Sequence, residues 1–85
     1  MPSPLRVTLY GRPGCSLCDH AEQMLARIGR RIPLALELVN IEADDALHQR
    51  YVFEIPVVAV DGAEVAKAPI YERALEETLA SLVRR

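Results

Sequence analysis

The sequence predicts an α/β domain spanning residues 1–85, in which a four-stranded mixed sheet carries helices on both faces. The first observation is that the spacing of apolar residues switches repeatedly between the strand period of about two and the helix period of about 3.6. The resulting order of elements is β-α-β-α-β-β-α. The second observation is the strand-helix-strand start, which gives parallel pairing through a right-handed crossover. The third is Asp61-Gly62, a strong hairpin signal that adds antiparallel strands.

The first strand is predicted at residues 5–10, where apolar and polar side chains alternate. Residues 11–14 then break the strand, because Gly and Pro favour turns. The first helix is predicted to begin at Ser16 and to end near Gly29, with Pro33 beyond it. Its apolar residues recur at helical spacing and form the predicted buried stripe: Leu17, Ala21, Met24, Leu25 and Ile28.

The second half of the chain continues this alternation. A strand is predicted at residues 33–41 and a short helix within residues 42–52. Residues 55–60 are almost wholly apolar and β-branched, which is typical of a central strand, and residues 63–67 are its predicted antiparallel partner. A last helix is predicted, ending in Arg84 and Arg85, with a buried stripe of Tyr71, Leu75, Thr78, Leu79 and Leu82.

Composition narrows the function classes. Hydrophobic residues make up 51% of the chain, enough to build a core without covalent cross-links. The formal net charge of -2 argues against nucleic acid as a partner, because phosphate binding needs a concentrated basic surface. No apolar run approaches the ~20 residues of a membrane span, and the first residues lack the apolar segment of a signal peptide. We therefore expect a soluble, cytoplasmic protein.

The two cysteines, Cys15 and Cys18, lie in the stretch "GRPGCSLCDH". Cys15 follows a strand and a turn and directly precedes the predicted helix, where unpaired N–H groups and the helix dipole stabilise a thiolate. Such positions lower a cysteine pKa, so we expect Cys15 to be the nucleophile and Cys18, one turn further on, to be the resolving thiol. In a reducing compartment a lasting structural disulfide is not expected.

Three charged or titratable neighbours could change the acidity or the proton transfer of Cys15 and Cys18. Arg12 could stabilise a thiolate or hold an anionic thiol substrate, whereas a carboxylate at Asp19 opposes a second negative charge beside Cys18. His20 is a candidate proton shuttle, although a single His on a helix surface is most often simply solvated. The net effect on the cysteines stays open.

The segments "TLYGRPGCSLC", "VNIEAD" and "EIPVVAVDG" resemble glutaredoxin-like proteins of the thioredoxin-fold superfamily, in particular a small branch with the signature RPGC-x-LC. The resemblance covers almost the whole chain and implies a thioredoxin-like fold. It also implies a dithiol–disulfide oxidoreductase that uses Cys15 and Cys18 on protein or small-molecule disulfides. In that family the proline matching Pro56 is cis, and the backbone of the preceding residue, here Ile55, pairs with substrate. Arg12 matches a basic residue that contacts glutathione.

The sequence departs from glutathione-using members of this family at residues 65–72. In those members a Gly-Gly-x-Asp-Asp stretch at the start of the last helix binds the glutamyl end of glutathione, whereas this chain reads "VAKAPIYE" in that region, so those binding residues cannot be carried over. Lys67 and backbone N–H groups near Ile70 are the candidates that could replace it. We expect no tightly bound cofactor, a monomer, a disulfide-bearing protein or low-molecular-weight thiol as substrate, and glutathione or a reductase as electron donor.

Two other readings of the cysteine pair remain. One is a metal or iron–sulfur module, but zinc usually takes four ligands and a single Cys-x-x-Cys supplies two, so a dimer would have to bridge the site. The other is a redox-inert interaction domain on the same scaffold, since a fold does not fix a function. The second cysteine argues against it, because a scaffold does not need a resolving thiol.

Overall fold

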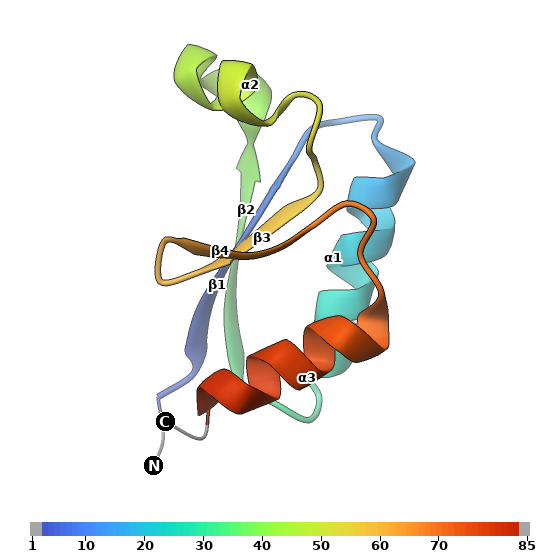
Figure 1. The fold of residues 1–85 in the computed structure, drawn as a ribbon, viewed down its shortest axis with the longest axis vertical. Coiled ribbons are helices and arrows are strands. Elements are labelled where there is room, and N and C mark those ends of the chain that lie inside the picture. Colours follow the sequence, from blue (N-terminus) through green and yellow to red (C-terminus); the bar gives the residue numbers. More distant parts are fainter. Residues whose placement is uncertain (1–2, 84–85) are drawn as a thin grey trace.

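The computed structural model describes residues 3–83 and contains one four-stranded sheet with the strand order β2-β1-β3-β4 (Figure 1). The predicted order of elements is confirmed, with a short 3₁₀ turn added before the second helix. The elements in chain order are β1 (Leu5–Gly11), α1 (Ser16–Ile28), β2 (Leu34–Asn40), η1 (Ile41–Ala43), α2 (Asp45–Tyr51), β3 (Val57–Val60), β4 (Ala63–Lys67) and α3 (Glu72–Val83). The predicted helix end at Arg84 and Arg85 lies outside the described residues.

The sheet is mixed, as the sequence predicts. β1 pairs with β2 in parallel, and with β3 in antiparallel fashion. β3 and β4 form an antiparallel hairpin with an irregularity between Val58 and Ala59. The turn between them places Asp61 at φ 50° and Gly62 at φ 85°, as a two-residue hairpin turn with positive φ at both positions requires. The register leaves Val58 and Val60 on the same face of the sheet as Val7 and Leu9.

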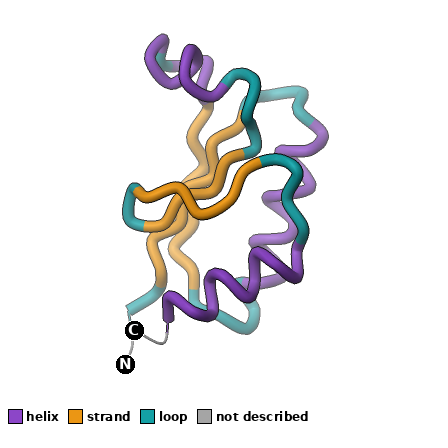
Figure 2. The backbone as a smooth tube through the Cα atoms, viewed as in Figure 1, coloured by secondary structure: helices purple, strands orange, loops and turns teal. Residues whose placement is uncertain are grey.

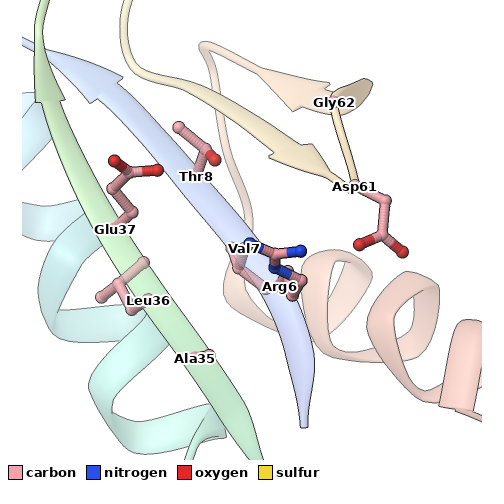
Figure 3. A pocket seen from close by; sticks show the side chains of 8 residues that line it. All are labelled: Arg6, Val7, Thr8, Ala35, Leu36, Glu37, Asp61 and Gly62. Atoms are coloured by element: carbon pink, nitrogen blue, oxygen red, sulfur yellow. The ribbon is translucent and has the colours of Figure 1, made fainter. Parts of the chain in front are cut away.

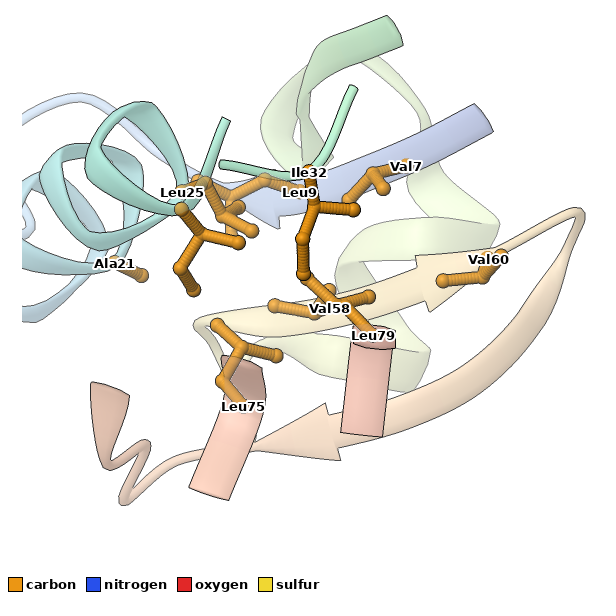
Figure 4. Close-up of a cluster of buried hydrophobic side chains, with 10 residues drawn as sticks. Val7, Leu9, Ala21, Leu25, Ile32, Val58, Val60, Leu75 and Leu79 are labelled. Carbon is orange, nitrogen blue, oxygen red and sulfur yellow. The ribbon is translucent and has the colours of Figure 1, made fainter. Parts of the chain in front are cut away.

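Helices lie on both faces of this sheet (Figures 1 and 2). α1 and α3 cover one face and enclose the main core, to which Leu25, Leu75 and Leu79 contribute from the helices (Figure 4). α2 packs at one end of the opposite face, where Tyr51 joins Ile41 in a second, smaller cluster. Burial of these apolar side chains is the main force that holds the layers together.

The predicted stripe of α1 is wrong at one position. The buried residues of this helix are Cys18, Ala21, Leu25 and Ile28, whereas Leu17 is 58% exposed. Successive residues of a helix are rotated by about 100°, so a helix that turns Cys18 inward carries Leu17 away from the sheet. The cysteine, and not the leucine, is the first residue of the buried stripe.

The predicted stripe of the last helix also needs a correction. Leu75 and Leu79 are buried, and Thr78 and Leu82 are half-buried, but Tyr71 is 68% exposed. Tyr71 precedes the first residue of α3, so the helical period does not extend to it.

None of the helices within residues 3–83 has the length and apolar character that spanning a membrane requires.

Candidate redox site

Cys15 is the residue that caps the N-terminus of α1. It has an extended backbone (φ −96°, ψ 105°), and the helix begins at the next residue, Ser16. The turn that delivers it from β1 passes through Gly14, whose φ of +77° is a left-handed conformation that favours glycine. The strand, the turn and the helix therefore place Cys15 where the sequence predicts it.

Cys15 and Cys18 are joined by a disulfide, with their Cα atoms 5.2 Å apart, so the structure describes the oxidised form. The Sγ of Cys15 also accepts a hydrogen bond from the backbone N–H of Cys18 at 3.1 Å. This sulfur thus occupies the place that a Ser or Asp oxygen takes when it caps a helix. Cys18 is only 6% exposed, whereas Cys15 is half-buried. The Cys15 end of the disulfide is therefore the more accessible one.

Gly11, the last residue of β1, lies directly against the inner cysteine. A Cβ atom at this position would stand 3.1 Å from both the Cβ and the Sγ of Cys18. This is closer than ordinary van der Waals contact, so the absence of a side chain at Gly11 allows Cys18 to pack onto the sheet. This role could not be predicted from the sequence, because nothing in the turn-forming stretch distinguishes a glycine needed for space from one needed for its backbone angles.

The Ile55–Pro56 peptide is cis, as the family resemblance implies, and Pro56 is buried. The backbone of Ile55 is only partly available to a substrate. Its N–H already donates to the carbonyl of Tyr51 at 3.0 Å, whereas its carbonyl has no hydrogen-bond donor within residues 3–83. The implied pairing of this residue with substrate is thereby restricted to the carbonyl group.

A second cis peptide, Ala68–Pro69, was not predicted. The N–H of Ala68 donates to the carbonyl of Pro56 at 3.0 Å, which joins the two proline segments through their backbones. A side-chain contact lies beside this bond, because Lys67 Nζ donates to Glu54 Oε1 at 3.2 Å. Lys67, a candidate for binding a glutathione carboxylate, is thus paired with a carboxylate of the protein itself.

The β4–α3 connection runs beside α1 (Figure 1). Residues of this connection, of α1 and Pro56 line an apolar groove of about 290 Å³. We call it the proline groove, and its main lining residues are Leu17, Met24, Pro56, Pro69, Ile70 and Tyr71. His20 lines it too. Leu17 lies between the two cysteines in sequence, but neither cysteine is among the residues that line the groove.

Arg12 belongs to a different hollow. This hollow, of about 190 Å³, is lined by Arg12, Cys18, Asp19 and Glu22 together with residues of β2, and it shares no residue with the proline groove. β2 and β4 form opposite edges of the sheet, so the two hollows open on opposite sides of the cysteine pair. The structure therefore does not bring Arg12 and Pro56 into one pocket.

A larger hollow, of about 550 Å³, lies on the sheet face that α2 leaves open (Figure 3). Arg6, Thr8 and Glu37 project from β1 and β2 there, and Asp61 stands at the β3–β4 turn. It contains neither cysteine. No three His, Cys, Asp or Glu side chains within residues 3–83 are grouped as metal ligands. The cysteine pair is therefore the candidate site that carries chemistry.

Comparison with known proteins identifies the family. The profile of the glutaredoxin-like domain (DUF836) matches residues 6–81. The chain belongs to this family. The glutaredoxin-like chain is also similar in structure to protein XcR50 from X. campestris, with 33% identity, a TM-score of 0.76, and 88% of this chain and 96% of that one covered. No curated protein sequence matches it.

More distant structures share the fold of this glutaredoxin-like domain. Protein Ne2328 from Nitrosomonas europaea has 23% identity and a TM-score of 0.78 over 91% of this chain and 93% of that one. Thioredoxin 1 from Thermosipho africanus has 14% identity and a TM-score of 0.69 over 93% and 94%. The fold is therefore thioredoxin-like, and family membership together with the Cys15–Cys18 pair supports a thiol–disulfide redox role.

Proposed function

We propose that this glutaredoxin-like domain is a dithiol–disulfide oxidoreductase, with Cys15 as the nucleophile and Cys18 as the resolving thiol. The observation that carries the proposal is the position of the Cys15 sulfur, which caps α1 and accepts the N–H of Cys18 at 3.1 Å. A thiolate at a helix N-terminus is stabilised over the thiol, which lowers its pKa and raises the reactive fraction at neutral pH.

The reduced protein would act in two steps. The Cys15 thiolate attacks one sulfur of a substrate disulfide, the substrate S–S bond breaks, and the departing thiolate takes a proton from solvent. Cys18 then loses its proton and attacks the Cys15 sulfur of the mixed disulfide. This step releases the second substrate thiol and forms the Cys15–Cys18 disulfide, the oxidised form that the structure describes.

The substrates are protein or small-molecule disulfides, and the oxidised domain is reduced again by glutathione or by a reductase. No tightly bound cofactor is needed for this cycle, because both electrons reside in the two thiols. The donor can be tested by offering the oxidised protein glutathione or a thioredoxin reductase system in turn. The rate at which free thiols appear then distinguishes the two.

A trapping experiment tests the roles of the cysteines. In Cys18→Ser the second step is blocked, so incubation with a disulfide substrate should accumulate a stable mixed disulfide on Cys15, visible as added mass. Cys15→Ser is the matched control and should trap at least about tenfold less, because Cys18 is buried. If Cys15→Ser traps substrate as fast as Cys18→Ser, the assignment of roles is wrong; if neither traps any, the proposed function fails.

A further inference from the structure

We propose that the outer edge of β2 pairs with the β2 edge of a second copy of this chain, in antiparallel fashion and with Leu36 at the two-fold axis. This interaction surface goes beyond the proposed function. Three features carry it: an edge strand that lacks protection, exposed leucines along that strand, and a pair of opposite charges on its other face. The protein would then form a dimer and not the monomer expected from the sequence.

The two edge strands of the sheet, β2 and β4, differ in how they are protected. Native proteins usually blunt a sheet edge with short strands, charged side chains or bulges, because its free N–H and C=O groups can pair with another chain. β4 has five residues, carries the charges of Glu64 and Lys67, and lies beside the irregularity of the β3–β4 hairpin. β2 has seven residues, carries the charge of Glu37 alone, and pairs with β1 in an unbroken register. β2 is therefore the edge that is open to pairing.

The backbone groups of β2 alternate in direction along the strand. The N–H of Leu5 donates to the carbonyl of Pro33 at 3.0 Å, so the odd-numbered residues of β2 direct their N–H and C=O groups at β1. Leu34, Leu36 and Leu38 direct theirs away from the sheet. Within residues 3–83 β2 pairs with β1 alone, so these groups can form a second ladder. Such a ladder has to place even-numbered residues of the two copies opposite one another.

The leucines of β2 also present apolar side chains. Leu36 and Leu38 are 37% and 54% exposed, whereas Val7, which pairs with Leu36 on β1, is buried. The helices thus cover the centre of the sheet and leave its β2 margin partly exposed. Antiparallel pairing centred on Leu36 sets this residue against its own copy and Leu34 against Leu38 of the second copy. Removing this apolar surface from water favours the pairing.

Opposite charges lie on the other face of β2. With Leu36 at the axis, Glu37 of the second copy lies opposite Ala35, and Ala35 in turn pairs with Arg6 of β1. Arg6 and this glutamate are then two strand spacings apart, about 10 Å, with the small side chain of Ala35 between them. Arg6 and Ala35 line the hollow on the open face of the sheet, so the glutamate would enter that hollow beside Arg6 (Figure 3). Neither Arg6 nor Glu37 has an ion-pair partner within residues 3–83.

The charges also distinguish this register from its neighbours. A register centred on Glu37 pairs the whole strand, but it places the two Glu37 carboxylates directly opposite each other, which is destabilising. A register centred on Leu38 sets Glu37 opposite Val39 and away from Arg6. With Leu36 at the axis the two glutamates are diagonal, about 7–8 Å apart, and each has an arginine in its row. The two-fold axis repeats the contact between Arg6 and Glu37, so the β2 edge is complementary to itself.

Sedimentation velocity of the oxidised protein between about 1 and 500 µM measures the association. We expect a mass that rises with concentration from that of one chain to that of two. Leu36→Lys places two like charges at the axis and should weaken the dimer at least about tenfold. Phe53→Lys is the matched control, because Phe53 is 96% exposed and belongs to neither β2 nor the hollow. Circular dichroism shows whether each variant is folded.

Charge reversal tests the register without removing apolar surface. Arg6→Glu and Glu37→Arg should each dimerise at least about fivefold more weakly, because like charges then meet across Ala35. An equimolar mixture of the two variants should form a heterodimer, since opposite charges face each other at both symmetry-related contacts. Sedimentation at a concentration where neither variant dimerises alone detects it. A contact between Arg6 and Glu37 within one chain cannot produce this rescue.

Amide hydrogen exchange locates the ladder on the strand. The N–H groups of Leu34, Leu36 and Leu38 should exchange at least about tenfold more slowly at high than at low protein concentration. The edge amides of β4 are the internal control and should exchange at the same rate at both concentrations.

The outcomes decide between this dimer and its alternatives. A protein that stays monomeric up to the highest concentration, or a dimer that survives in Leu36→Lys, would overturn the proposal. Association that Phe53→Lys abolishes would overturn it as well, because the contact would then lie elsewhere. Failure of the mixed charge variants to associate would overturn the register. None of these measurements depends on the reactivity of Cys15, so the proposed function is tested separately.

Discussion

The sulfur of Cys15 and the backbone N–H of Cys18 are joined by a hydrogen bond of 3.1 Å across the first turn of α1. Cys15 is thereby both the cap of the helix and the accessible end of the disulfide. When the disulfide is reduced, the same N–H group and the partial positive charge of the helix N-terminus act on the Cys15 thiolate. Cys18 differs from Cys15, because its side chain is buried and its own N–H is directed at the Cys15 sulfur.

We therefore predict different acidities for the two thiols. In Cys18→Ser, the rate of alkylation of Cys15 with iodoacetamide should rise with a midpoint at least about one unit below the ordinary cysteine pKa of ~8.5. In Cys15→Ser, Cys18 should react at least about tenfold more slowly at pH 7, because its side chain is buried. A midpoint for Cys15 at or above the ordinary value would contradict the capping argument.

The contact between Gly11 and Cys18 gives a second prediction. Gly11→Ala would place a Cβ 3.1 Å from the Cβ and Sγ of Cys18, so the strand or the cysteine has to shift. Overpacking of this kind lowers the free energy of unfolding by about 1–3 kcal/mol, which denaturant unfolding of the oxidised protein measures. It should also slow closure of the Cys15–Cys18 disulfide.

The control for this experiment is Gly14→Ala. A Cβ at Gly14 would meet no atom within 4 Å, but the residue has a φ of +77°, so an alanine there costs roughly 1 kcal/mol of backbone strain without crowding Cys18. Loss of stability in both variants, but slower disulfide closure in Gly11→Ala alone, would separate crowding from strain. Unchanged stability of Gly11→Ala would show that Cys18 adjusts freely.

The fold could be predicted from the sequence because its signals are local. Alternation in β1, the switch of period at Ser16 and the Asp61-Gly62 turn each act within a few residues, and together they determine the order of elements. The phase of α1 could not be predicted as reliably. Leu17 and Cys18 are neighbours and both apolar, and the close packing of Cys18 against Gly11 is a contact between two segments that the spacing of apolar residues does not reveal.

The rest of the candidate site depends on contacts between distant segments. The proline groove is lined by Leu17 of α1 together with Pro56 and Pro69, and no periodicity links these positions. The ion pair between Lys67 and Glu54 could not be predicted from the sequence either, nor could the hydrogen bond from the Ile55 N–H to the Tyr51 carbonyl. The cysteine motif indicates the reaction, but the tertiary structure is needed to describe what surrounds it.

The two ion pairs between α1 and α3 predict how stability depends on pH. Arg27 donates hydrogen bonds to the Glu72 carboxylate, and Arg31 does the same for Glu76, and these bonds lower the pKa of each carboxyl below its usual value near 4.5. A carboxyl with a lowered pKa in the folded state stabilises the fold above the unfolded pKa. This contribution is lost as the pH falls from about 4.5 through the lower, folded pKa.

The test compares unfolding at pH 7 and at several values below 4.5. Glu72→Gln/Glu76→Gln should show a smaller loss of stability on acidification than the unsubstituted protein, because it lacks the two shifted groups. Glu77→Gln is a suitable control, since Glu77 pairs at 3.5 Å with Arg73 of the same helix and does not connect α3 to α1. An identical acid response in the double variant and the unsubstituted protein would show that these pairs do not differ between folded and unfolded states.

The hydrogen bond between Tyr51 and Glu64 links α2 to β4, and it predicts how the pKa of the Glu64 carboxyl responds to substitution. The Tyr51 hydroxyl donates to Glu64 Oε1 at 2.8 Å, and this bond is the main cause that lowers the pKa of Glu64. Tyr51→Phe should therefore raise the Glu64 pKa toward its usual value, although Arg50, 3.1 Å away, retains part of the effect. Carbon-13 NMR of the Glu64 carboxyl follows this shift directly.

Tyr10→Phe is the matched control, because Tyr10 stacks on the ring of Tyr51 with centroids 4.8 Å apart, and its hydroxyl makes no hydrogen bond to Glu64. Burial, and then the bond to Glu64, raises the pKa of Tyr51 above 10.0. A raised tyrosine pKa in the folded state means that stability is complete below the unfolded pKa and is lost as the pH rises from there through the folded value. Tyr51→Phe should weaken that alkaline loss. Tyr10→Phe should leave the Glu64 titration in place and change the alkaline loss less, because the charge of Tyr10 is the last of the causes that raise the Tyr51 pKa. An unchanged Glu64 pKa in Tyr51→Phe would contradict the role of the Tyr51 hydrogen bond and leave Arg50 and Lys67 as the groups that lower it.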